Sequence, residues 1–308
     1  MSETIHILGA GSLGLLWAAR CERAGLDCRL IMRRPHAAAD WHARDDQLVL
    51  EQQGQLTTHK VKGELAGENQ QPITHLIVST KAWASAEALE SIAPRLQPES
   101  HLLLLQNGLG SQQAASDRFP DRRVLYASVT DGAWKRAANH VVWAGAGQTS
   151  IGDPRQQPAP GWLTLLTRAG IDWRWEPDIL STLWVKLAIN CAINPISALH
   201  DCLNGEVVDH AGTSFAPLLA ELHMLLTSQK VALSLEQLHR RILEVIQATS
   251  GNSSSMRQDL QARRRTEIDF IVGHACRTAH QAGLATPILN RLHRQLQNRL
   301  AELDLPQD

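Results

Sequence analysis

The chain has 308 residues, of which 44% are hydrophobic and 20% are charged, and its formal net charge is −1. This length favours two domains over one small core, and the composition is that of an ordinary globular protein. A nearly neutral chain has no broad basic field to attract nucleic acid or an anionic membrane, so we expect neither as a partner.

The cysteines are scattered and odd in number, and no two form a CxxC pair. We therefore expect neither a metal site nor a disulfide framework, and a reducing cytoplasm fits. The longest purely aliphatic run, 102–105, is far shorter than the roughly 20 residues of a membrane helix. No signal peptide is expected, because no basic stretch and apolar segment precede Ile5.

Short apolar runs alternate with helical patterns in the first part of the chain. This alternation predicts an α/β domain, with a parallel sheet covered by helices on both faces. In chain order we expect strands over residues 4–8, 28–32, 75–80, 101–106 and 123–127, a helix over 13–24, and a hairpin over 47–62 with Gly54 near its turn.

A glycine-rich turn connects the first strand to the first helix. Its sequence, GxGxxG, comprises Gly9, Ala10, Gly11, Ser12, Leu13 and Gly14. In such a turn the first glycine permits a tight bend, the second lets the backbone approach a diphosphate, and the third lets helix and strand pack closely. The motif alone could be a flexible turn, but its place between strand and helix favours dinucleotide binding.

The end of the second strand indicates which dinucleotide binds. An NAD site usually has an acidic residue here, whereas this chain has Met32, Arg33 and Arg34. A guanidinium suits a 2′-phosphate, so NADP is favoured over the alternative that both arginines are solvated loop charges. Asp27 precedes the strand and is expected at its wrong end.

Two more polar residues follow strands of the predicted sheet, where ligands of parallel sheets bind. Lys81 follows the strand ending at Thr80, and Asn107 follows the run ending at Gln106. Lys81 could offer charge to a phosphate or carboxylate, and Gly108 after Asn107 would leave room for a nicotinamide ribose. An ordinary loop role for either residue remains open.

Beyond Pro177 the chain consists of long amphipathic segments with few strand signals. We expect helices over residues 178–200, 215–232, 235–249, 255–282 and 287–300. The predicted domains are residues 1–177, which bind NADP, and residues 178–308, which are helical and bind substrate.

A polar stripe marks the first of these helices. Lys186, Asn190 and Asn194 recur at every fourth position in an otherwise apolar segment, so they share one helix face. Buried polar groups need hydrogen-bond partners, and neighbouring helices packed against this face would supply them. The alternative is a wall of a substrate pocket, where the lysine ammonium donates a proton to a ketone oxygen and the amides hold the substrate.

A second polar group lies between Gly251 and Asp269. Its serines could cap a helix, and Glu267 could be an ordinary helix acid. In the functional interpretation, Asn252 and Ser255 offer hydrogen-bond donors to a carboxylate, while Glu267 orients the lysine or contacts the cofactor.

These motifs together resemble the ketopantoate reductase (2-dehydropantoate 2-reductase) family. The likeness covers nearly the whole chain, through GAGSLG, STKAW, QNGLG, WVKLAINCAINPISAL, LNGE and SSSMRQD…RRTEIDF. It implies a Rossmann domain followed by an all-helical domain like the C-terminal domain of 6-phosphogluconate dehydrogenase. It also implies the reduction of 2-dehydropantoate to (R)-pantoate with NADPH, a step toward pantothenate and coenzyme A.

The resemblance also implies roles for individual residues. Lys186 takes the proton-donor position, Glu267 is the functional acid and also a cofactor contact, and Asn107 lies near both ligands. The positions that match substrate contacts are Asn190, Asn194, Asn204 and Ser255, with Asn252 beside the last; those that match NADP contacts are Arg33, Lys81 and, through its backbone, Ala133. Residues 129–140 depart from the family pattern, which leaves the placement at Ala133 open.

Two alternatives remain at this point. One is a related reductase of another branched or hydroxylated 2-keto acid, and the other is a non-catalytic NADP-binding sensor. Lys186 and its asparagines argue against the sensor, which would not need a proton donor. The sequence leaves open whether the protein is a monomer or a homodimer.

Overall fold

The computed structural model describes residues 3–308, and the chain divides into two units. The first unit extends to Gln106 and continues from Ser111 to Ile179. The second comprises Leu180–Asp308 together with the short segment Asn107–Gly110. The sequence did not indicate that this segment leaves the first unit.

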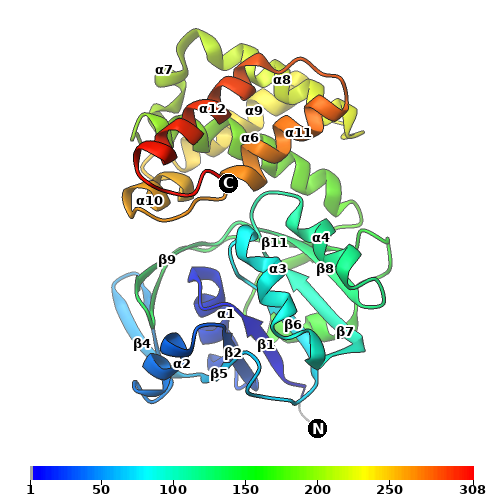
Figure 1. Cartoon of the computed structure of the whole chain (residues 1–308), viewed down its shortest axis with the longest axis vertical. Coiled ribbons are helices and arrows are strands. Elements are labelled where there is room, and N and C mark those ends of the chain that lie inside the picture. Colours follow the sequence, from blue (N-terminus) through cyan, green and yellow to red (C-terminus); the bar gives the residue numbers. More distant parts are fainter. Residues whose placement is uncertain (1–2) are drawn as a thin grey trace. The chain divides into compact units, whose positions relative to one another are not determined.

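An eight-stranded sheet forms the centre of the first unit (Figure 1). Its strands follow the order β12-β11-β8-β7-β6-β1-β2-β5, and every pair is parallel except β8 with β11. The strands are β1 (Ile5–Leu8), β2 (Cys28–Met32), β5 (Lys62–Leu65), β6 (Ile73–Val78), β7 (Leu96–Leu104), β8 (Arg123–Val129), β11 (Thr149–Gly152) and β12 (Trp173–Trp175). The predicted α/β class is confirmed, but the sheet is mixed, because β11 runs antiparallel to β8. The short strands β5, β11 and β12 were not predicted.

Helices accompany these strands, and their apolar sides form the core. They are α1 (Ser12–Arg23), α2 (Pro35–His42), α3 (Ala82–Glu90), α4 (Ser111–Arg118) and α5 (Thr164–Arg168). Helix α1 is the most deeply buried, with Leu15, Leu16 and Trp17 fully inaccessible. Its position against β1 therefore holds the turn between them in place.

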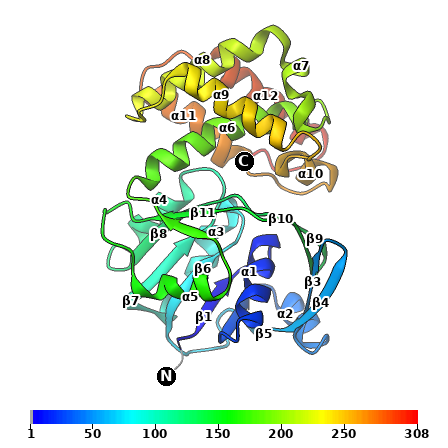
Figure 2. The ribbon, with the colours of Figure 1, turned by 180° about the vertical axis from the view of Figure 1, so that it is seen from behind.

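A smaller four-stranded sheet in the same unit has the order β4-β3-β10-β9 (Figure 2). The hairpin of β3 (Gln47–Gln52) and β4 (Gln55–Lys60) is the one predicted, and Gly54 in its turn has a φ of 77°. The hairpin of β9 (Gly132–Ala137) and β10 (His140–Gly145) was not predicted. It falls in the region that departs from the family pattern.

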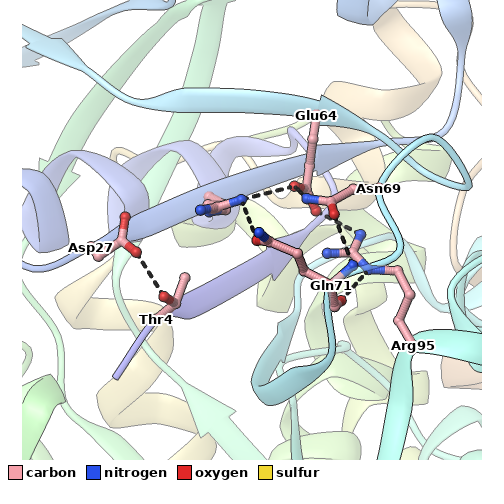
Figure 3. A network of polar contacts seen from close by, with 7 residues as sticks. Thr4, Asp27, Glu64, Asn69, Gln71 and Arg95 are labelled. Carbon is pink, nitrogen blue, oxygen red and sulfur yellow. Dashed lines mark hydrogen bonds and ion pairs between the residues drawn. The ribbon is translucent and has the colours of Figure 1, made fainter. Parts of the chain in front are cut away.

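A polar network ties β5 to its neighbours at one edge of the large sheet (Figure 3). Arg95, only 2% exposed, contacts Glu64 at 2.6 Å and donates to the Gln71 carbonyl at 3.0 Å. Asn69 also donates to Glu64, at 2.7 Å. Because a buried guanidinium and carboxylate each need partners, these contacts explain why so polar a strand can join the sheet.

The second unit is helical. Its helices are α6 (Ile179–Leu199), α7 (Val207–Ala211), α8 (Phe215–Ser228), α9 (Leu235–Ala248), α10 (Ser255–Gln261), α11 (His274–Gln281) and α12 (Pro287–Glu302). The single helix predicted over 255–282 is wrong. Arg263, with a φ of 50°, leaves the helical conformation after α10, and a π-helical turn at Asp269–Gly273 precedes α11. Neither glycine nor proline occurs between Ser255 and Phe270 to mark this break, which concealed it.

Helix α6 is long and apolar enough, by length and composition, to cross a membrane. Within its most apolar window, however, 56% of the helix is buried inside the protein. It also carries Lys186 and two asparagines, so we interpret it as the core helix of the second unit.

Candidate functional site

The turn between β1 and α1 has the geometry that a dinucleotide diphosphate requires. Gly9 has a φ of 111°, and a Cβ atom at Gly14 would lie 2.2 Å from the Gly9 carbonyl oxygen. Ser79 Oγ donates to that same oxygen at 2.8 Å. Gly11 is the N-cap of α1 and provides no side-chain cap, so the N–H groups of the first turn can point at an anion. These residues fit the predicted dinucleotide.

Arg33 lies at the end of β2, where the 2′-phosphate residue was expected. Its Nη1 is 2.6 Å from Oε2 of Glu87 on α3, a side chain that is 82% exposed. Hydrogen bonding to Arg33 lowers the pKa of the Glu87 carboxyl. No sequence pattern indicated this partner, which lies 54 residues further along the chain, on helix α3.

Asp27 lies at the other end of β2, as predicted. Its carboxylate accepts a hydrogen bond from Thr4 Oγ1 at 2.7 Å (Figure 3). Asp27 therefore bonds to Thr4 just before the start of β2, at the end of the strand opposite the expected cofactor site. At the expected cofactor end, Lys81 lies three residues beyond Val78, the last residue of β6, and serves as the N-cap residue of α3.

A second group of candidate residues lies in the second unit, around α6. Lys186 is partly buried, and burial lowers its pKa to about 8, while the nearby Glu267 carboxylate acts in the opposite direction. Glu267 itself is 7% exposed. An ammonium with this pKa keeps its proton at neutral pH yet releases it more readily than an exposed lysine does.

Asn107 belongs to the same group. Asn190 Nδ2 donates to Asn107 Oδ1 at 2.9 Å, which joins two predicted site residues. The backbone also fits tightly here, because Leu109 N donates to the Phe270 carbonyl at 2.8 Å. A Cβ at Gly108 would come within 2.3 Å of that carbonyl oxygen. This contact therefore requires a glycine, and the room for a nicotinamide ribose beside it stays a prediction.

The other predicted substrate residues divide into buried and exposed ones. Asn194 and Asn204 are 6% and 8% exposed. Asn204 donates to Thr249 Oγ1 at 3.0 Å, whereas its buried Oδ1 has no hydrogen-bond partner in the described part of the chain. Asn252 and Ser255 are exposed side chains, although the Asn252 carbonyl accepts from Asn204 N at 3.0 Å.

The N-cap of α10 is Ser254, the residue before the predicted Ser255. Its Oγ accepts from Arg257 N at 3.1 Å and receives a bond from Ser197 Oγ at 2.7 Å. The capping interpretation thus applies to Ser254. Ser255 remains open to another role.

One cation near the glycine turn was missed. Lys135 Nζ on β9 donates to the Ala10 carbonyl oxygen at 2.8 Å. No sequence pattern indicated this lysine, because it lies in the unpredicted hairpin, two residues beyond Ala133.

Comparison with known proteins identifies the family. A model described as ketopantoate reductase PanE/ApbA matches residues 5–156, and its C-terminal counterpart matches residues 178–299. The chain is 34% identical to a 2-dehydropantoate 2-reductase of Vibrio cholerae, over 95% of this chain and 96% of that protein. It is 31% identical to the enzyme of the same name from Yersinia pestis, over 97% and 96%.

Solved structures share the fold. A ketopantoate reductase of Ralstonia eutropha superposes with a TM-score of 0.88 at 24% identity, covering 98% of this chain and 99% of that one. A D-mandelate dehydrogenase solved with NADH and anilino(oxo)acetate also gives 0.88, at 20% identity, covering 98% and 100%. The chain belongs to the ketopantoate reductase family, and it is an oxidoreductase with a Rossmann-type unit and a helical unit.

Proposed function

We propose that this member of the family reduces ketopantoate to (R)-pantoate, with NADPH as the hydride donor and Lys186 as the proton donor. Support for the substrate comes from relatives at 30% identity or more that carry the name 2-dehydropantoate 2-reductase. Support for the proton donor comes from one observation above all. Lys186 lies on the apolar helix α6 and interacts with the carboxylate of Glu267, and burial lowers its pKa to about 8.

Bound NADPH supplies the hydride that reaches the ketone carbon. The ketone oxygen gains negative charge as this happens, and the Lys186 ammonium stabilises it and transfers a proton, which completes the alcohol. Glu267 keeps the ammonium protonated before the transfer, because its carboxylate opposes the effect of burial. The neutral amine then regains a proton from solvent.

The asparagines of the second unit would orient the substrate. Asn190 and Asn194 follow Lys186 along α6, and Asn107 is hydrogen bonded to Asn190. We assign them, with Asn204, Asn252 and Ser255, to the substrate hydroxyl and carboxylate groups. The Oδ1 of Asn204, which has no hydrogen-bond partner among residues 3–308, supports this, since a buried acceptor without a partner costs stability unless a ligand donates to it.

The cofactor site comprises the turn from Gly9 to Gly14 for the diphosphate and Arg33 for the 2′-phosphate. Lys81, Asn107, the Ala133 backbone and Glu267 complete the proposed set. Preference for NADPH over NADH rests on Arg33 and on the sequence at the end of β2, where Met32 and two arginines stand in place of an acidic residue. Glu87 reaches Arg33 from α3 and would have to yield to the phosphate.

We further propose a cytoplasmic enzyme that acts on a small keto acid as a monomer or homodimer, without nucleic-acid or membrane partners. The near-neutral charge and the free state of all five cysteines support this setting. A dimer is the state named for the ketopantoate reductase of Staphylococcus aureus.

Oxidation of NADPH by the purified protein in the presence of 2-dehydropantoate tests the function. NADH and a panel of other branched or hydroxylated 2-keto acids serve as comparisons. We expect the highest kcat/KM with NADPH and 2-dehydropantoate. A higher value for another keto acid would reassign the substrate, and binding of NADPH without turnover of any keto acid would favour the sensor.

A further inference from the structure

Lys135 lies on a face of β9 where a charged side chain is unexpected. Cross-strand partners in an antiparallel pair point to the same side of the sheet. Lys135 is opposite Val141, which is fully buried, and Ala133 is opposite Trp143, which packs against the core. Lys135 therefore extends from the face of the hairpin that covers the core of the first unit, although the residue itself is exposed to solvent.

Its neighbour Arg136 points to the other face. Arg136 Nε lies 3.0 Å from Glu51 Oε2, and its guanidinium covers the Trp134 ring at 5.0 Å. Glu51 is opposite Val142, which in turn is opposite Trp134, so all of these residues share the outer face. Two adjacent cations thus occupy opposite sides of one strand, and only Lys135 reaches the glycine turn.

The contact between Lys135 and the turn is direct. Its ammonium donates to the Ala10 carbonyl at 2.8 Å, one residue before the N-cap of α1. The N–H groups of that first helical turn carry partial positive charge. An ammonium at this place adds a full positive charge beside them, where a dinucleotide places its two phosphates.

The hairpin that carries Lys135 is anchored to α1. Arg20 of α1 lies 3.6 Å from Asp131, just before β9, and both side chains are at most 4% exposed. The guanidinium also covers the ring of Trp143 on β10 at 4.5 Å, and Arg20 donates to the Gly170 carbonyl. Asp131 further accepts bonds from Gly147 N and Trp143 Nε1. These buried contacts hold β9 in register with the start of the helix.

We propose that Lys135 is a diphosphate-binding residue of the cofactor site. In this assignment the ammonium binds the diphosphate that NADPH and NADH share. Arg33 binds the 2′-phosphate that only NADPH carries. The inference rests on the proposed use of a nicotinamide dinucleotide. It does not depend on which keto acid is reduced.

Binding of NADPH and of NADH to the Lys135→Met variant, measured by calorimetry without keto acid, tests the proposal. We expect the Kd of both dinucleotides to rise by the same factor, roughly tenfold, as for a lost hydrogen bond to a charged group. Arg136→Met removes the same charge from the next residue and should leave both Kd values within about twofold, since surface charges of this kind contribute little. Lys135→Arg, which keeps the charge, should retain most of the affinity.

Several results would overturn the assignment. Unchanged Kd values in Lys135→Met would make the contact with Ala10 merely structural. An equal loss of affinity in Arg136→Met would show that Lys135 acts only through general electrostatic attraction. A loss for NADPH alone would place Lys135 at the 2′-phosphate. If the unaltered protein bound neither dinucleotide, the cofactor proposal and this one would both fail. Binding without reduction of 2-dehydropantoate would contradict only the proposed substrate.

Discussion

Arg33 and Glu87 form an ion pair in which Nη1 of one is 2.6 Å from Oε2 of the other. Arg33 is the residue proposed to hold the 2′-phosphate of NADPH. The phosphate and the Glu87 carboxylate would therefore compete for the same guanidinium.

Glu87→Gln is expected to tighten NADPH binding by about two- to fivefold, because an exposed ion pair contributes only modestly and would no longer have to be broken. NADH affinity should not change. The Kd values of both dinucleotides measure the effect. Glu90→Gln is the matched control, since Glu90 lies on the same helix but pairs with Arg118. Equal affinities for the Glu87 variant and the unaltered protein would show that the ion pair does not compete.

Arg33→Ala is expected to weaken NADPH binding by about 1.5–3 kcal/mol, the contribution of a hydrogen bond to a charged group. The loss should be specific to NADPH, so the ratio of the NADH and NADPH dissociation constants reports it. If the variant kept the original preference, the 2′-phosphate would have to be held elsewhere.

Lys186→Ala is expected to lower kcat by about 10²–10⁴-fold, the usual contribution of a general acid. Dinucleotide binding should persist, which calorimetry can verify. Lys60→Ala, which removes an exposed ammonium paired with Asp45, should leave turnover intact. Near-normal turnover in the Lys186 variant would eliminate it as the proton donor.

The pH profile offers a second measure of Lys186. Its pKa is lowered from 10.5 to about 8, so the protonated acid predominates below that pH and is lost above it. The kcat/KM should therefore fall by about tenfold per pH unit on the alkaline side. Because Glu267 raises the pKa, Glu267→Gln should move this alkaline limb to lower pH. A limb that stayed in place would show that Glu267 does not act through the lysine.

Gly14→Ala is expected to destabilise the first unit by about 1–3 kcal/mol, the usual cost of overpacking. The added methyl group would meet the Gly9 carbonyl oxygen at 2.2 Å and Ser79 Oγ at 2.4 Å. Gly161→Ala is the control, because no described residue other than its chain neighbours lies within 4 Å of the new Cβ. Thermal unfolding measures the loss of stability, and NADPH affinity measures the effect on the glycine turn. A fully stable Gly14 variant would contradict the close packing.

Much of this protein was determined locally by its sequence. The strand over 28–32, the hairpin around Gly54 and the helix of Lys186 were predicted because their apolar periodicity and glycines act over a few residues. The glycine turn was predicted for the same reason, and Gly9 and Gly14 have the tight geometry that the motif implies. The family resemblance supplied roles that periodicity alone could not.

Contacts between residues far apart in the chain were decided only by the tertiary structure. Glu87 meets Arg33 across 54 residues, Asn107 meets Asn190 across 83, and Lys135 meets Ala10 across 125. A local pattern specifies which side of a strand or helix a residue occupies. It does not specify which other element will pack there, because that depends on the burial of the whole core. For this reason the sequence indicated the glycine turn and the helix of Lys186. It did not indicate that Glu87 contacts Arg33 or that Lys135 contacts the glycine turn.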